Sequence, residues 1–298
     1  MTLEQLRVFV AVAEREHVTR AAEALGLAQS ATSAAIAALE AQTGAKLFHR
    51  LGRGIALTEA GTLFLPEARA VLARAAAAEL VLSELGGMQR GTLAVQASQT
   101  ISAYWLPRHL VAFRRAWPGI EVQLTIGNTA QVAAAVRDGT AELGFVEGSV
   151  EDPALTSRRV ARDQLVVVVG PEHPWASGAP VTAAQLLDTE WVLREPGSGT
   201  RAVLEAALEA SGIAPERLRV ALTLPSNEAV RAAVEAGMGA TAISASAAAP
   251  SLEAGLLCRV DWALPEREFR VLRHVERYRS AAADALLALI DAGARRSP

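Results

Sequence analysis

One run of residues in the C-terminal third of the chain is well suited to hold a small anion: Arg194-Glu195-Pro196-Gly197-Ser198-Gly199-Thr200-Arg201. Its two glycines leave backbone N–H groups accessible, and Ser198 and Thr200 add hydroxyl donors. A helix is predicted to begin near Thr200, and its N-terminus adds partial positive charge. The run is not a P-loop, because its length differs and Arg201 stands where the lysine would follow. For the motif alone, the alternative is an ordinary Ser/Gly turn with a helix N-cap.

Small polar residues also follow two other predicted strands. Ser98-Gln99-Thr100 comes after a strand expected at 92–96, and Asn128-Thr129 after one expected at 121–126. In open α/β sheets, ligands bind outside the carboxyl ends of the strands. Glu147 is expected to border the ligand cleft formed at these strand ends. Its negative charge disfavours a highly charged anion there. The predicted ligand site comprises Ser98, Gln99, Thr100, Asn128, Thr129, Glu147, Gly197, Ser198, Gly199 and Thr200.

The elements that must position these residues alternate in type beyond Gly91, which is typical of parallel α/β sheets. Strands are expected at 92–96, 121–126, 143–146, 164–170, 191–193, 219–224 and 241–244, and helices near 105–117, 129–138, 200–210, 228–236 and 281–292. We expect the chain to cross into a second subdomain near residue 163 and to return near 265. This predicts a lobe I of residues 89–163 and 265–298 and a lobe II of residues 164–264.

The first 60 residues predict three short helices and a hairpin. In the first helix Leu3, Leu6, Phe9, Val10 and Ala13 fall on one face. The second helix is expected to start with Thr19 as N-cap and to end at Gly26. The third is expected at 29–41, with Ala31, Ile36 and Leu39 facing inward. Helices with this spacing, followed by a basic hairpin, indicate a winged helix-turn-helix.

The third helix would present polar residues to a DNA groove. Gln can pair with adenine, Ser and Thr can reach phosphates or base edges, and Arg contacts phosphates. The predicted DNA-binding residues are Arg20, Gln29, Ser30, Thr32, Ser33, Arg50 and Arg53. The alternative is a three-helix bundle whose polar turn only caps a helix.

A long helix is predicted from Thr58 to about Leu85. Small or apolar residues recur on a narrow seam: Phe64, Ala68, Val71, Ala75, Ala78, Leu82 and Leu85. Such a seam favours pairing of two helices along their length, although packing on the helix's own domain is the alternative. Pro66 is expected to kink the helix, and Gly86, Gly87 and Gly91 to form a hinge after it.

The N-terminal pattern resembles that of the LysR-type transcriptional regulators, and the resemblance extends over almost all 298 residues. It rests on Leu3-x-x-Leu6-x-x-Phe9, Thr19-Arg20-Ala21-Ala22, Gln29-Ser30-Ala31-Thr32-Ser33, Leu47-Phe48-x-Arg50 and Leu57-Thr58-x-Ala60-Gly61. It implies an α/β protein with a winged helix-turn-helix at 1–58, a linker and dimerisation helix at 59–88, and a two-lobed periplasmic-binding-protein-like effector domain at 89–298. Ala28 departs from the family pattern, which usually has a capping Ser there.

The resemblance further implies a transcriptional regulator rather than an enzyme. Its partners would be double-stranded promoter DNA, further copies of the chain in a homodimer or homotetramer, and a small effector between the lobes. The run at 194–201 is similar to that of members that sense metabolites of sulfur or carbon assimilation. A small acidic metabolite or oxyanion is therefore the expected effector, with no cofactor.

Composition limits the other classes of protein to which the chain could belong. The net charge of −3 gives no global nucleic-acid signal, so DNA binding must come from a local surface. The single Cys258 excludes an intramolecular disulfide, and the five His are too scattered to suggest a metal site. The sequence shows no apolar leader and no long apolar run, which predicts a cytoplasmic protein without membrane contact. A solute-binding module or enzyme, and an architectural DNA binder without ligand sensing, are the competing readings.

Overall fold

The computed structural model describes residues 1–51, 54–84 and 91–294. The chain divides into two compact units, Met1–Gly87 with Asp138–Thr140 and the remaining residues. In the part of the chain that is described, no helix is both long and apolar enough to cross a membrane.

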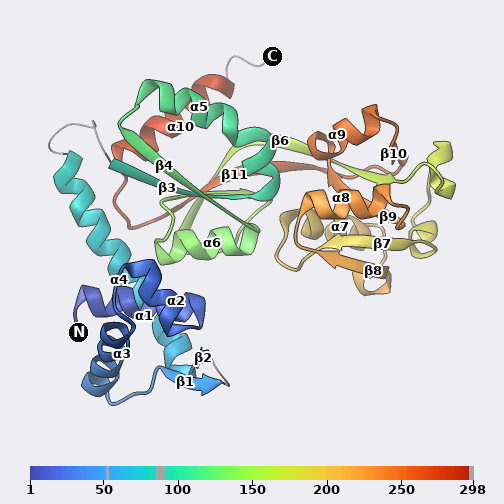
Figure 1. The fold of residues 1–298 in the computed structure, drawn as a ribbon. Helices are drawn as coiled ribbons and strands as arrows, with labels where there is room; N and C mark the ends of the chain where they lie inside the picture. The colour runs from blue at the N-terminus through green and yellow to red at the C-terminus, as the bar shows by residue number, and fades with distance from the viewer. Residues whose placement is uncertain (52–53, 85–90, 295–298) are drawn as a thin grey trace. The chain divides into compact units, whose positions relative to one another are not determined.

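The N-terminal unit is a winged helix-turn-helix followed by a long helix (Figure 1). Its elements are α1 (Leu3–Arg15), α2 (Val18–Leu25), α3 (Gln29–Thr43), β1 (Phe48–Leu51), β2 (Gly54–Leu57) and α4 (Glu59–Glu84). Gly26 ends α2 with φ of 67°, as predicted. The predicted N-cap Thr19 is wrong, because the N-cap is His17, two residues earlier, and its side chain accepts from the Arg20 N–H.

The core of this unit determines which face of α4 is free. Leu6, Phe9, Leu39, Leu47 and Ala68 are buried together, and Phe64 packs against them. The predicted pairing seam is therefore wrong in its first half, since Phe64 and Ala68 face the unit's own core. Val71, by contrast, is 42% exposed. Pro66 lies inside α4, whereas the seam residue Leu85 and the hinge glycines 86 and 87 lie outside the described residues.

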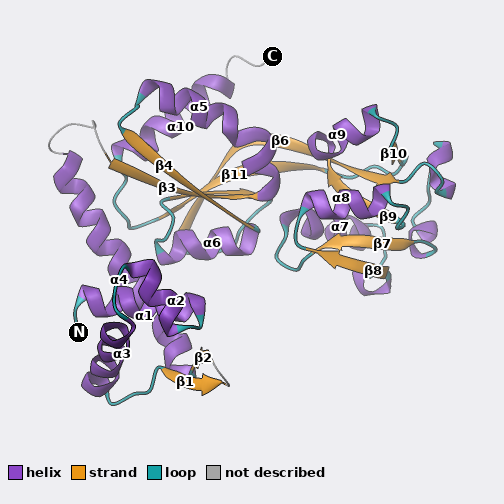
Figure 2. Ribbon diagram, in the orientation of Figure 1, coloured by secondary structure: helices purple, strands orange, loops and turns teal. Residues whose placement is uncertain are grey.

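The C-terminal unit contains a mixed sheet covered by helices on both faces (Figure 2). Its strands are β3 (Gly91–Ser98), β4 (Ile120–Gly127), β5 (Leu143–Glu147), β6 (Leu155–Val169), β7 (Glu190–Arg194), β8 (Arg219–Leu224), β9 (Ala240–Ser244), β10 (Cys258–Arg259) and β11 (Glu266–His274). Its helices are α5 (Leu106–Ala116), α6 (Thr129–Asp138), α7 (Gly199–Ala210), α8 (Asn227–Glu235), α9 (Ala245–Glu253) and α10 (Ala281–Ala294). A π-helical turn, Ile101–Trp105, precedes α5.

Two long strands join the two lobes of this unit. The sheet order is β4-β3-β5-β11-β6-β9-β7-β8, with β10 on β6. The first part of β6 pairs with β11, and its last part, from Leu165 to Val169, pairs with β9. Helices α5, α6 and α10 flank the first lobe, and α7, α8 and α9 the second (Figure 1). The predicted lobe boundaries stay predictions.

The sheet is not wholly parallel, which corrects the sequence-based expectation. The pairs β3–β4, β3–β5, β7–β8 and β7–β9 are parallel, whereas β6 and β11 run antiparallel to their neighbours. The strand expected at 164–170 begins at Leu155, and β11 and α9 were not predicted. Charged residues hide the strand signal, because β6 carries Arg158, Arg159 and Arg162, and β11 begins Glu266-Arg267-Glu268.

Candidate functional site

The first turns of α3 form the candidate DNA-binding surface. Gln29, Ser30 and Ser33 are exposed there, and Arg20 on α2 and Arg50 on β1 are exposed as well. Arg53 lies outside the described residues. Thr32 was predicted to contact DNA, and this is wrong for the observed helix, because Thr32 is fully buried and its hydroxyl donates to the Ala28 carbonyl at 3.2 Å.

The error at Thr32 is one of helical phase. The inward stripe of α3 runs through Thr32, Ile36 and Leu39, whereas Ala31, which was predicted to face inward, is exposed. The substitution at Ala28 has the expected local effect, since no side chain caps this helix. The Thr32 hydroxyl donates to the Ala28 carbonyl, so it stabilises the helix rather than facing the groove.

Glu40 near the end of α3 anchors the start of the hairpin, and sequence reasoning missed it. Its carboxylate accepts hydrogen bonds from Lys46 Nζ at 2.6 Å, from the Leu47 N–H at 2.9 Å and from the Phe48 N–H at 3.3 Å. Burial alone raises the pKa of Glu40, but these bonds and the Lys46 charge outweigh it and hold the pKa below its usual value. Glu40 therefore ties α3 to the strand that carries Arg50.

Arg267 on β11 is the centre of the C-terminal site. Its side chain is 1% exposed and lies between the lobes. Nη1 donates to Thr200 Oγ1 at 2.9 Å, and Nη2 donates to Thr100 Oγ1 at 3.3 Å. Nε and Nη2 both contact Asp163 Oδ2, at 2.7 and 2.6 Å. One buried cation thus links the loop after β3, the start of α7 and the strand β6.

The loops after the parallel strands meet in a second hydrogen-bonded network. Arg194 donates to both carboxylate oxygens of Glu195, at 2.8 and 2.9 Å, and to Asn227 Oδ1 at 2.6 Å. Asn227 Nδ2 in turn donates to Thr100 Oγ1 at 3.1 Å. Asn128 Nδ2 donates to Glu195 Oε1 at 3.2 Å, which joins the end of β4 to the end of β7.

Gln99 fastens the two lobes directly. Its Nε2 donates to the Pro225 carbonyl at 3.2 Å, and its Oε1 accepts from the Asn227 N–H at 2.9 Å. The Tyr104 hydroxyl reaches Glu228 on α8 at 3.5 Å. Burial and the Glu228 carboxylate raise the pKa of Tyr104. The loop after β3 is therefore a contact between lobes as well as a candidate ligand loop.

Gly197 and Gly199 are required by their surroundings. Gly197 has φ of +85°, and Gly199 is so close to the first lobe that a Cβ would lie 2.8 Å from Thr129 Oγ1 and 2.9 Å from the Glu147 carbonyl oxygen. Glycine at these positions lets the N-terminus of α7 approach β5 and α6. The expectation that the run frees its N–H groups needs one correction, since the Ser198 N–H is already bonded to the Glu195 carbonyl at 3.2 Å.

Every residue predicted for the ligand site lies at a strand end, in the loop that follows it or in the first turn of the next helix. Ser98, Thr100, Glu147, Ser198 and Thr200 are all buried. Sequence reasoning missed Asp163, Arg267, Asn227 and Ser244, whose hydroxyl donates to Asp163 at 2.7 Å. Asn227 and Ser244 follow or end strands, so the criterion that found Asn128 could have found them. Arg267 has no local signal, because it lies within a strand.

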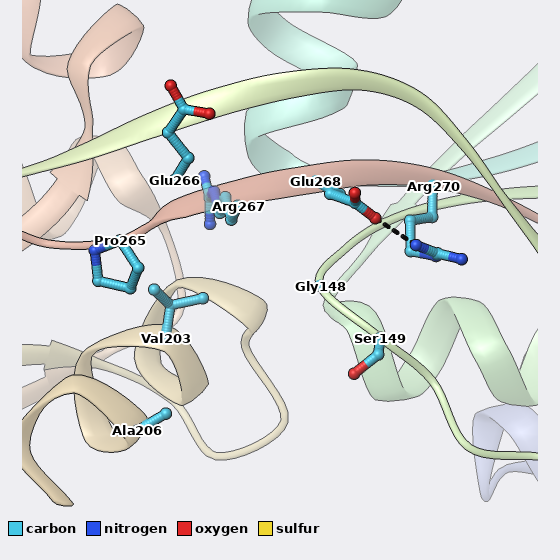
Figure 3. A pocket seen from close by; sticks show the side chains of 9 residues that line it. All are labelled: Gly148, Ser149, Val203, Ala206, Pro265, Glu266, Arg267, Glu268 and Arg270. Carbon is cyan, nitrogen blue, oxygen red and sulfur yellow. Dashed lines mark hydrogen bonds and ion pairs between the residues drawn. The ribbon is translucent and has the colours of Figure 1, made fainter. Parts of the chain in front are cut away.

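A pocket of about 310 Å³ adjoins the cluster (Figure 3). It lies between α7, the loop after β5 and β11. Its lining residues are Gly148, Ser149, Val203, Ala206, Pro265, Glu266, Arg267, Glu268 and Arg270. Figure 3 shows Val203 and Ala206 on α7 on one side and Ser149 on the other, with the Glu268–Arg270 ion pair beside them. The pocket thus combines small apolar walls with charged groups from β11.

Comparison with known proteins places both units in one family. The family model "Bacterial regulatory helix-turn-helix protein, lysR family" matches residues 3–62, and "LysR substrate binding domain" matches residues 86–295. The HTH-type transcriptional regulator YeiE of Escherichia coli K12, itself described as uncharacterized, is 35% identical over 291 residues, covering 98% of this chain and 96% of YeiE.

Solved structures agree with this assignment. Full-length CbnR complexed with its target DNA is 25% identical with a TM-score of 0.67, covering 100% of both chains. The regulatory domain of Synechocystis PCC6803 CcmR in complex with 2-PG is 26% identical with a TM-score of 0.64, covering 70% of this chain and 100% of that one. The matches define a transcriptional regulator with a DNA-binding domain and an effector-binding domain. The chain belongs to the LysR family.

Proposed function

We propose that this regulator binds promoter DNA and that a small anionic effector, held between the two C-terminal lobes, modulates that binding. The effector contacts would come from the loops after β3, β4 and β7 and from Arg267, with Glu147 at the end of β5 bordering the site. The solved complex of CcmR with 2-PG supports the idea of a small-molecule ligand in this domain.

The proposal of an anion rests on three buried hydroxyl groups whose protons lack acceptors. The oxygen of Thr100 already accepts from Arg267 and from Asn227, and the oxygen of Thr200 accepts from Arg267. A hydroxyl that accepts keeps one proton to donate. Among the residues that the structure describes, neither proton has an acceptor, and the buried Ser98 hydroxyl has no hydrogen-bond partner. Buried donors are normally satisfied, and an acceptor-rich ligand would satisfy these three together.

An anion supplies such acceptors. Arg267 adds positive charge, and the N-terminus of α7 favours a negative group placed near Gly199 and Thr200. Because Thr100 belongs to one lobe and Thr200 to the other, an anion bonded to both would hold the lobes together. Ligand binding would therefore change the relative orientation of the lobes.

The link to DNA is through assembly. We infer that the chain forms a homodimer or homotetramer in which the exposed side of α4, including Val71, and the effector domains contribute contacts. Lobe closure would then alter the spacing of the DNA-binding domains. Gln29, Ser30 and Ser33 are proposed to face the bases, and Arg20, Arg50 and Arg53 the phosphates.

Thermal unfolding of the full chain tests the effector. We would screen sulfur oxyanions, phosphorylated sugars and small carboxylates, and expect one class to raise the Tm. A ligand at 100 times its Kd adds about 2.7 kcal/mol of stability. Thr100→Ala combined with Ser198→Ala should abolish the shift but leave DNA binding without ligand intact. Glu253→Gln on the exposed side of α9 serves as control. A shift that survives the double substitution, or no shift with any class, contradicts the proposal.

A further inference from the structure

The buried charges between the lobes are unequally compensated. Arg267 contacts Asp163 at 2.6 and 2.7 Å, and Arg194 contacts Glu195 at 2.8 and 2.9 Å. These are the distances of strong charge-assisted hydrogen bonds. Glu147 is 4% exposed, yet its carboxylate lies 3.4 Å from the Thr129 hydroxyl and 3.9 Å from Arg267 Nη2. Glu147 is therefore a buried carboxylate that is only loosely held.

Glu147 also lies where the proposed anion would bind. Its Cβ would be 2.9 Å from a Cβ at Gly199, the first residue of α7, and the Thr129 hydroxyl is equally close to that point. The carboxylate thus shares its surroundings with the proposed ligand: Arg267, a threonine hydroxyl and the positive end of a helix. Asp163 already pairs closely with Arg267, so this cation does not need Glu147 as its countercharge.

We propose that Glu147 determines the charge specificity of the effector site, as a built-in competitor for the effector's acid group. This inference rests on the proposed anion site. In the free protein the Glu147 carboxylate lies beside the Thr129 hydroxyl and Arg267, two of the donors available to an anion. An effector must displace it, and an acid group that makes shorter contacts to Arg267 and the threonine hydroxyls can do so.

The competitor selects against small inorganic anions. A bare anion gains only the contacts that Glu147 gives up, and it remains close to a carboxylate of the same sign. A larger acid also gains contacts in the adjoining pocket, where Gly148 and Ser149 follow Glu147 directly and face Val203 and Ala206 of α7 (Figure 3). The site therefore favours an organic acid whose body fills this pocket over sulfate or phosphate.

Binding of sulfate and of inorganic phosphate to the full-length chain tests this inference. Isothermal titration and thermal unfolding would compare the wild type, Glu147→Gln and the control Glu253→Gln, which removes an exposed carboxylate by the same change. Glu147→Gln should bind sulfate at least about tenfold more tightly than the wild type, because a like charge near the anion is gone. The control should bind like the wild type. Glu147→Ser repeats the test if Gln at this position prevents folding.

Phosphate separates this role from another. Phosphate carries a proton at neutral pH and sulfate does not, so a Glu147 that accepts a hydrogen bond from the ligand would make Glu147→Gln bind phosphate more weakly. Weaker phosphate binding by Glu147→Gln would overturn the inference. So would a sulfate affinity equal to that of the wild type, or no sulfate binding by either the wild type or Glu147→Gln. An organic acid that binds wild type and Glu147→Gln equally would also overturn it, while leaving the proposed function standing. Tight anion binding without any effect on DNA binding would contradict the proposed function but leave the inference about Glu147 standing.

Discussion

Arg267 and Asp163 form a fork-shaped ion pair between the two strands that connect the lobes. Arg267 Nε and Nη2 lie 2.7 and 2.6 Å from Asp163 Oδ2, and both side chains are almost fully buried. The pair holds the guanidinium in one orientation, in which Nη1 donates to Thr200 and Nη2 also donates to Thr100. Asp163 therefore positions the guanidinium. Arg267 then contacts one lobe through the Thr100 hydroxyl and the other through the Thr200 hydroxyl.

Breaking this pair should destabilise the C-terminal unit. Asp163→Asn leaves a buried arginine without its countercharge, and such losses cost about 3–5 kcal/mol. Replacing both residues, Asp163→Leu with Arg267→Met, should cost less than the single change. Urea unfolding followed by circular dichroism measures both. If the single and double variants unfold at the wild-type midpoint, the pair does not hold the lobes.

The Glu40 contacts should make the N-terminal unit acid-sensitive. A carboxylate with a lowered pKa stabilises the fold above its ordinary value of 4.5, and that contribution is lost as pH falls through the lower folded-state pKa. Glu40→Gln should lower the unfolding free energy at neutral pH by about 1–3 kcal/mol. The difference between wild type and variant should shrink as the pH is lowered below 4.5. A pH-independent difference would mean that packing, not charge, explains the loss.

Residues on the DNA-binding surface should separate by role. Arg50→Ala should weaken binding to all sequences and reduce the slope of log affinity against log salt by about 1. Gln29→Ala should instead relax base preference, by about 1–3 kcal/mol at one position. Thr32→Val is the matched control, since its buried hydroxyl faces Ala28 and the substitution should leave base preference unchanged. Fluorescence anisotropy over a salt series distinguishes these outcomes.

Val71 is the seam residue on which assembly can be tested. An aspartate there would have to be desolvated in a helix pair, so Val71→Asp should shift the sedimentation coefficient toward that of a single chain. Ala76→Asp, exposed on the same helix but outside the seam, should assemble like the parent. Equal assembly of both variants would assign the subunit contact to another surface.

The sequence by itself determined the elements and most of the candidate effector loops. Strands such as β8 and helices such as α6 have the predicted bounds, because hydrophobic periodicity is a local property. Polar residues that follow strands, such as Thr100 and Asn128, could be assigned to one edge of the sheet from topology alone. The family could be recognised from residue spacing in the first 61 positions.

Tertiary structure alone decided which residues face each other. Arg267 and Asp163 are separated by 104 positions and meet only because β11 and β6 pair antiparallel. The choice between Thr32 and Ala31 as the inward residue depends on the phase of α3 against α1, which a helix of nearly uniform small residues does not reveal. Likewise, Phe64 and Ala68 have the spacing of a pairing seam, but burial against Phe9 and Leu39 assigns them to the core of the unit itself. Such contacts join distant segments, and no local pattern encodes them.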